Sequence, residues 1–104
     1  MRLSDAKLKG LIEEATVDAY NESEQRGGFQ AMIDENLTLP FTTQILGVEV
    51  TVERVDITAA DAIVAVCRRG KTRQAIPILE LPLPKPEPKG AEWIEAYRRW
   101  TRGR

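Results

Sequence analysis

The spacing of apolar residues changes once along this chain, from a helical period to an alternating one. Over residues 4–25 apolar side chains recur every three or four positions, as on one face of a helix, and Ser4 can cap the start. Over residues 48–52 valines alternate with Glu49 and Thr51, as in a half-buried strand. The two patterns occupy separate segments, so the sequence predicts an α+β fold whose helical part precedes its sheet.

Two helices are predicted in the first third of the chain, which we bound at residues 4–37. Gly27-Gly28 interrupts the helical pattern after residue 25, and the same spacing resumes over residues 29–37. We therefore expect a long helix, a flexible joint at the two glycines and a shorter second helix. Leu39-Pro40 ends the helical part, because the residue before a proline favours extended backbone.

Four or five short antiparallel strands are predicted between residues 41 and 81. Gly47 marks one turn, and the run from Arg68 to Lys71 marks another. The expected strands cover residues 41–46, 48–52, 62–68, 72–76 and 78–81. Short strands joined by tight turns favour a curled sheet or a small barrel of the SH3-like kind.

Proline stands at every second position from Pro82 to Pro88, which favours an extended connector over residues 82–90. A last helix is predicted over residues 91–101. Its apolar side carries an aromatic stripe, which consists of Trp93, Ile94, Tyr97 and Trp100. We expect this stripe to dock the helix on the rest of the chain, so that residues 1–104 form one domain.

The chain has no histidine and one cysteine, which narrows its chemistry. Without histidine it lacks the commonest general base and the commonest metal ligand, which argues against zinc and against Ser-His or Cys-His catalysis. Cys67 lies in an apolar run and is expected to be buried and unreactive. The oxygen donors that remain suit a hard cation. No nucleophile motif or phosphate loop accompanies the carboxylates, so we predict that the chain is not an enzyme.

Five acidic residues in the helical part are candidate metal ligands: Asp18, Glu22, Glu24, Asp34 and Glu35. On one continuous helix Glu22 would extend the apolar side with Asp18 beside it, so two like charges would repel close to the core. A bound cation would relieve that repulsion, and Ca²⁺ takes about six to eight oxygens in flexible geometry. Asp34 and Glu35 lie beyond the glycine joint, and they either join this site or hold an ion of their own. The sequence contains no EF-hand loop.

Charge is distributed unevenly, because residues 1–36 carry eight acidic and four basic residues while residues 37–104 carry eight and eleven. The basic residues gather in a turn and in the last helix, as Arg68, Arg69, Lys71 and Arg73 and as Arg98, Arg99, Arg102 and Arg104. Basic residues beside aromatic rings can hold phosphates and stack bases, so a nucleic-acid or protein-partner module is the alternative function. A pI near 5.5 makes nucleic acid the weaker of these two partners.

Several longer stretches resemble one protein family. They are ATVDAYNESEQRGGFQAMIDENLTLPF, ILGVEVTVERVDI, AIVAVCRRG, IPILELPLP and AEWIEAYRRW, in this order along nearly the whole chain. Together they resemble the small bacterial calcium-binding protein family typified by CcbP. The resemblance implies a compact α/β fold that binds Ca²⁺ through acidic residues outside any EF-hand. The ligands that it implies are Asp18, Glu22, Asp34 and Glu35, with Glu24 as a further one.

No run of apolar residues approaches the roughly 18 to 20 that cross a membrane, and the start of the chain lacks the apolar middle of a secretory signal. We therefore expect a cytoplasmic protein with no membrane partner. On the calcium interpretation it acts as a buffer or a sensor, and a protein partner is left open.

Overall fold

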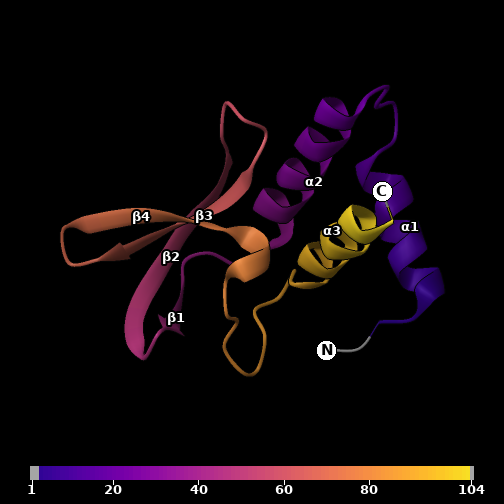
Figure 1. Ribbon diagram of the computed structural model, residues 1–104. Helices are drawn as coiled ribbons and strands as arrows, with labels where there is room; N and C mark the ends of the chain where they lie inside the picture. Colours follow the sequence, from indigo (N-terminus) through magenta and orange to yellow (C-terminus); the bar gives the residue numbers. More distant parts are fainter. Residues whose placement is uncertain (1–2, 104) are drawn as a thin grey trace.

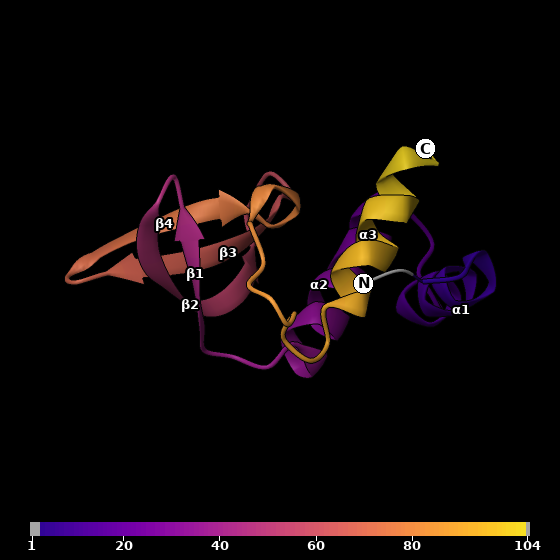
Figure 2. The ribbon, with the colours of Figure 1, turned by 90° about the horizontal axis from the view of Figure 1, so that it is seen from below.

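The computed structural model describes residues 3–103, and in this part three α-helices accompany a four-stranded sheet and a 3₁₀ helix (Figure 1). The elements in chain order are α1 (Asp5–Ala15), α2 (Glu22–Asn36), β1 (Phe41–Ile45), β2 (Val48–Ile57), β3 (Ile63–Arg69), β4 (Thr72–Pro77), the 3₁₀ helix η1 (Ile78–Glu80) and α3 (Glu92–Arg102). Figure 2 shows the helices grouped at one end of the molecule and the sheet at the other. The predicted α+β fold, with helices before and after the sheet, is confirmed.

The sheet is an antiparallel meander of order β1-β2-β3-β4. Its first and last turns hold two residues each, Leu46-Gly47 and Gly70-Lys71. β2 is longer than the predicted strand, because it passes an irregularity at Val52/Arg54 and continues against β3. The sheet is open, with β1 and β4 at its edges, so the barrel alternative is wrong.

The strand predicted over residues 78–81 is also wrong, because the chain forms η1 there. Pro77 lacks a backbone N–H and is the last residue of β4. Ile78 and Leu81 are both buried. Residues three apart lie on one side of a 3₁₀ turn, whereas on a strand they point to opposite faces. The turn therefore places both side chains in the core.

The break between the first two helices lies earlier than predicted. α1 ends at Ala15 and α2 begins at Glu22, so residues 16–21 form the joint and Gly27-Gly28 lies inside α2. A Cβ atom on Gly28 would overlap the Ala15 carbonyl oxygen. Gly28 therefore allows α2 to cross the end of α1 closely, and its role is in packing rather than flexibility.

α2 packs against β2 on one side and against α3 on the other (Figures 1 and 2). Its Phe29 and Ile33 have no exposed surface. The Phe29 ring centroid lies 5.4 Å from that of Tyr97 and 5.3 Å from that of Trp100, so the aromatic stripe of α3 packs on α2 as predicted. Cys67 of β3 is buried, and this burial raises the pKa of its thiol, as expected for an unreactive cysteine.

The proline-rich connector runs along one edge of the sheet and returns the chain to the helices. The hydroxyl of Thr43 on β1 donates to the Pro82 carbonyl at 2.6 Å. Near its other end the Thr38 N–H donates to the Lys89 carbonyl at 2.8 Å. Gly90 follows with φ +96°, in a conformation that favours glycine, and lies too close to α2 for a side chain. The connector therefore covers the edge of β1 and positions the start of α3.

Candidate metal centre

Residues 16–21 and the first turn of α2 form an exposed segment rich in acidic side chains. Asn21 caps α2, since its Oδ1 accepts from the Glu24 N–H at 2.8 Å. Glu24 Oε1 in turn accepts from the Tyr20 N–H at 2.8 Å. An Asn with a Glu three residues later is a reciprocal capping signal, and it explains why the helix predicted through residue 25 is interrupted here.

Asp18 and Glu22 are both exposed, but they do not lie on one helix. Asp18 lies in the joint with φ +60°, a conformation that Asp adopts more readily than most residues. Glu22 begins α2, its side chain is 57% exposed, and its carboxylate lies 4.0 Å from the Arg26 guanidinium. The interpretation that Glu22 extends the apolar side of a first helix is therefore wrong, because its side chain faces solvent rather than the core.

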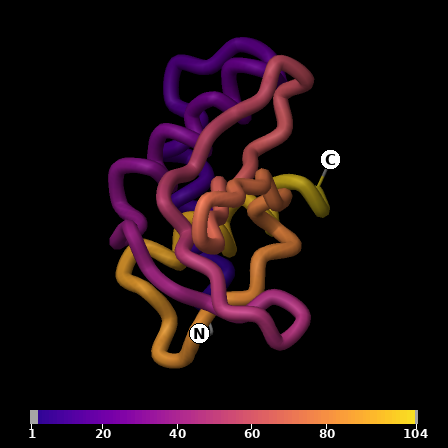
Figure 3. The backbone as a smooth tube through the Cα atoms, turned by 90° about the vertical axis from the view of Figure 1, so that its left-hand side faces the viewer, coloured from indigo at the N-terminus to yellow at the C-terminus, as the bar shows by residue number. Residues whose placement is uncertain are grey.

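The β2–β3 turn adds a carboxylate next to the first turn of α2, and Figure 3 shows the turn at the same end of the molecule as the α1–α2 joint. The Ser23 hydroxyl donates to Asp61 Oδ1 at 3.2 Å. The turn is held by the Thr58 hydroxyl, which accepts from the Ala60 and Ala62 N–H groups. Asp61 is not among the predicted ligands, because 38 positions separate it from Ser23 and no local spacing connects them. Its one local signal is that it is an acidic residue in a short turn.

We call the group of Asp18, Glu22, Glu24 and Asp61 the acidic corner. Asp34 and Glu35 lie at the opposite end of α2 and are exposed there. Twelve residues of continuous helix separate Glu22 from Asp34, which is about 18 Å at 1.5 Å per residue. A single ion cannot contact both ends of α2, so Asp34 and Glu35 do not share a site with the corner.

The acidic corner offers oxygen donors only, as a hard cation requires. Within residues 3–103 no three acidic or thiol side chains already converge as a metal-binding group. Asp18, Glu22 and Glu24 are exposed, so their side chains can change rotamer without unpacking the core. The donor chemistry thus fits a divalent calcium-like ion, and the closing of the ligand set would accompany binding.

The basic residues around the β3–β4 turn, which suggested nucleic-acid or protein-partner binding, are partly neutralised by ion pairs within the protein. Arg73 and Arg68 each donate to the Glu53 carboxylate at 2.8 Å, and these two bonds hold the pKa of Glu53 below its ordinary value. On α3, Arg99 pairs with an α1 carboxylate at 2.9 Å, and Arg104 lies outside the described residues. Trp93 and Tyr97 of α3 are buried in the core, where they cannot stack nucleic-acid bases, and the partly buried Trp100 ring is covered by the Arg26 guanidinium.

A model of the family Calci_bind_CcbP, described as calcium binding, matches residues 9–101. The chain belongs to this calcium-binding family. The match spans the second half of α1, α2, the whole sheet and most of α3, so the acidic corner and the Asp34-Glu35 pair both lie inside it. Membership in the CcbP family confirms the resemblance seen in the sequence and supports Ca²⁺ as the bound ion.

Comparison of this CcbP family member with curated proteins and with solved structures identified no relative. Across the described residues 3–103, none of the helices combines the length and the apolar character that crossing a membrane requires.

Proposed function

We propose that this CcbP family member binds Ca²⁺ at the acidic corner and acts as a cytoplasmic calcium buffer or sensor rather than as an enzyme. The observation that carries the proposal is the hydrogen bond between Ser23 and Asp61, at 3.2 Å. It connects the β2–β3 turn to the start of α2, so that carboxylates from two distant segments can contact one ion. The match to a calcium-binding family supplies the identity of the ion.

Glu24 and Asp61 each have oxygen capacity left for an ion. Glu24 uses Oε1 to accept from the Tyr20 N–H, but a carboxylate has about four lone-pair sites, so its second oxygen can still ligate. Asp61 Oδ1 accepts from Ser23, and the same reasoning applies to its other oxygen. Water and backbone carbonyls would complete the roughly six to eight ligands that Ca²⁺ takes.

The proposed site is not an EF-hand. An EF-hand supplies its ligands from one continuous loop of about 12 residues, with a closing bidentate glutamate and a fixed glycine. Here the joint between α1 and α2 is residues 16–21, and Asp61 belongs to a separate turn. The exposed Asp34-Glu35 pair at the other end of α2 is a second and weaker place for an ion, because fewer acidic groups accompany it.

The position of Arg26 between Glu22 and the Trp100 ring favours a sensor over a passive buffer. The Arg26 guanidinium lies 4.0 Å from the Glu22 carboxylate and also sits over the Trp100 ring, 5.3 Å from its centroid. A cation that binds Glu22 competes with Arg26 for the same carboxylate. Binding would therefore alter the surroundings of Trp100, which stacks on Tyr97 in α3.

Isothermal titration calorimetry with Ca²⁺ and with Mg²⁺ tests the site. We expect Ca²⁺ to bind more tightly than Mg²⁺, because a flexible multi-carboxylate site suits the larger ion. The Asp18→Asn, Asp61→Asn double variant should bind Ca²⁺ at least about tenfold more weakly, since the charge count of the ligands sets the affinity. The matched control is the Asp34→Asn, Glu35→Gln variant, which should keep the tighter of the two Ca²⁺-binding events, the one at the acidic corner. Equal heats for the wild type and the corner variant would contradict the assignment.

A further inference from the structure

The end of the sheet farthest from the helices carries an exposed apolar groove, which we call the sheet-tip groove. It has a volume of about 490 Å³. Its lining comes from all four strands and consists of Ile45, Val48, Val50, Cys67, Arg69, Gly70, Thr72, Gln74 and Ile76. Closer to the helices the same face of the sheet is buried, for example at Val52. The groove is therefore the part of the apolar face that the helices leave uncovered.

The rim of the groove carries a positive charge that forms no ion pair among the described residues, although Glu49 lines the adjoining pocket beside Arg69 and Gly70. Glu53 binds the Arg68 and Arg73 side chains on the opposite face, so these two arginines are occupied. Arg69 and Lys71 are exposed and form no ion pair with any described residue. The residues that line the groove include no acidic side chain. An acidic group on a partner would meet two cations next to an apolar surface.

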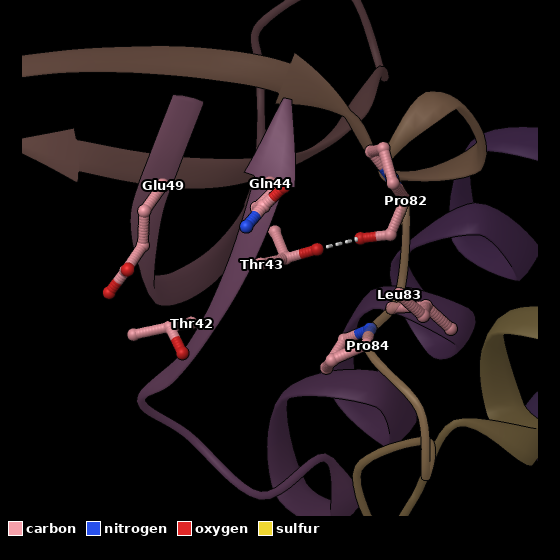
Figure 4. A pocket seen from close by; sticks show the side chains of 7 residues that line it. All are labelled: Thr42, Thr43, Gln44, Glu49, Pro82, Leu83 and Pro84. Carbon is pink, nitrogen blue, oxygen red and sulfur yellow. Dashed lines mark hydrogen bonds between the residues drawn. The ribbon is translucent and has the colours of Figure 1, made fainter. Parts of the chain in front are cut away.

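The two edges of the sheet differ in how far they are covered. The edge of β1 is followed by the connector, where Thr43 bonds to Pro82 and a small pocket of about 390 Å³ remains (Figure 4). β4 makes extensive contact with β3 alone, and most of its residues are exposed. Its outward backbone groups remain able to pair with an added strand. β4 is thus the edge at which an extended segment can bind.

Leu46 follows the groove residue Ile45, and both its exposure and its backbone conformation are unfavourable in a protein without a binding partner. It is 98% exposed, and it takes the first position of a two-residue turn with φ +52°, followed by Gly47 with φ +79°. Two positive φ values define a turn that favours Asn-Gly, and leucine is disfavoured there. A large apolar residue that is both strained and solvated, beside an apolar groove, indicates a contact surface.

We propose that the sheet-tip groove binds an extended acidic segment of a partner protein, which pairs with β4. Alternate residues of such a strand point to the groove face, so apolar side chains two positions apart would enter the groove beside Gln74 and Ile76 of β4. An acidic side chain or a terminal carboxylate would pair with Arg69 and Lys71. Nucleic acid is the poorer occupant, because two free cations flank an apolar floor rather than a basic track.

Fluorescence anisotropy of the full chain with labelled synthetic peptides tests the proposal. The probes are ten-residue peptides with valine or isoleucine at alternate positions and aspartate or glutamate between them. Peptides with lysine in place of the acids and a twenty-nucleotide oligothymidine serve as comparisons. We expect saturable binding of the acidic peptides only, weakened at least about tenfold by Arg69→Glu through charge reversal. Lys9→Glu on α1 makes the same charge change far from the groove and should leave binding unchanged.

Ile76→Thr separates docking from folding, because threonine suits a strand but removes most of the apolar contact with the added segment. It should weaken peptide binding at least about threefold. The fold should be retained, which an amide NMR spectrum with the dispersion of the wild type would show. Absence of binding by every acidic peptide at millimolar concentration would overturn the proposal. Tighter binding of the oligonucleotide would overturn it in favour of a phosphate ligand. A dimer that Ile76→Thr dissociates would overturn it in favour of a second copy of this chain.

Discussion

Gly27 and Gly28 are neighbours in α2 but have different surroundings. A Cβ atom on Gly28 would overlap the Ala15 carbonyl, while a Cβ on Gly27 would meet nothing within 4 Å. We expect Gly28→Ala to lower the free energy of unfolding by about 2 kcal/mol, because the crossing of α1 and α2 must open. Gly27→Ala should raise it by up to about 1 kcal/mol, since alanine favours helix. Urea unfolding of both variants measures the difference, and equal effects would contradict the close crossing.

Leu46 offers a second test on a single residue. Its φ of +52° is a conformation in which most side chains are strained and asparagine is tolerated. We expect Leu46→Asn to raise the free energy of unfolding by about 1 kcal/mol, as measured by urea unfolding. Leu46→Ala keeps the strain and serves as the control, so it should give no such increase. A loss of stability in Leu46→Asn would show that the leucine contributes to the isolated fold.

At the level of the elements, the start of α2 depends on its cap. Asn21→Ala removes the acceptor of the Glu24 N–H and should lower the free energy of unfolding by about 1 kcal/mol. It should also weaken Ca²⁺ binding, because the cap orders the backbone that carries Glu22 and Glu24. Asn21→Ser retains a capping oxygen and should restore most of both losses. Calorimetric titration and thermal unfolding of the two variants test this, and equal behaviour of both would contradict it.

The ion pairs of Glu53 with Arg68 and Arg73, which join β2, β3 and β4, contribute a stabilisation that depends on pH. The bonds from Arg73 and Arg68 lower the pKa of Glu53, so its ionised form is favoured in the folded state. The stabilisation is complete above the ordinary glutamate pKa of about 4.3 and is lost as the pH falls through the lower folded-state value. Glu53→Gln should therefore destabilise the protein at neutral pH, with a difference from wild type that vanishes in acid. Urea unfolding across pH measures this difference, and Glu49→Gln, an exposed change on the same strand, should show none.

The spacing of apolar residues predicted most helices and strands correctly, and the errors occurred where tertiary packing determines the structure. The alternation of valines predicted β2, and the aromatic stripe predicted how α3 docks. The prediction of a flexible joint at Gly27-Gly28 was wrong. Glycine is needed at position 28 because of its close contact with Ala15, which no local sequence pattern reveals. The strand over residues 78–81 was wrong because the burial of two residues three apart depends on where the core lies.

For the molecule as a whole, the candidate site could be predicted only in part. Asp18, Glu22 and Glu24 are close in sequence, so a search for clustered carboxylates finds them. The path of the sheet brings Asp61 to Ser23 in the first turn of α2, and its distance along the chain hides it from any spacing rule. The separation of Asp34 from the corner follows from α2 being continuous, which the predicted glycine joint obscured.

A sensor should transmit calcium binding from the corner to the core. We expect Ca²⁺ to change tryptophan emission, because Arg26 contacts both Glu22 and Trp100. Trp100→Phe should abolish that change while Ca²⁺ still binds by calorimetry, and the buried Trp93 provides the remaining emission. If the emission change persists in Trp100→Phe, the signal does not pass through Arg26.

We propose that Ca²⁺ binds between the start of α2 and the β2–β3 turn. An amide NMR titration of the ¹⁵N-labelled full chain with Ca²⁺ locates the ion most directly. We expect the largest amide shifts on residues 18–24 and 58–62 together, at the lowest calcium concentrations. Largest shifts at residues 34–36, or shifts in only one of the two corner segments, would contradict it.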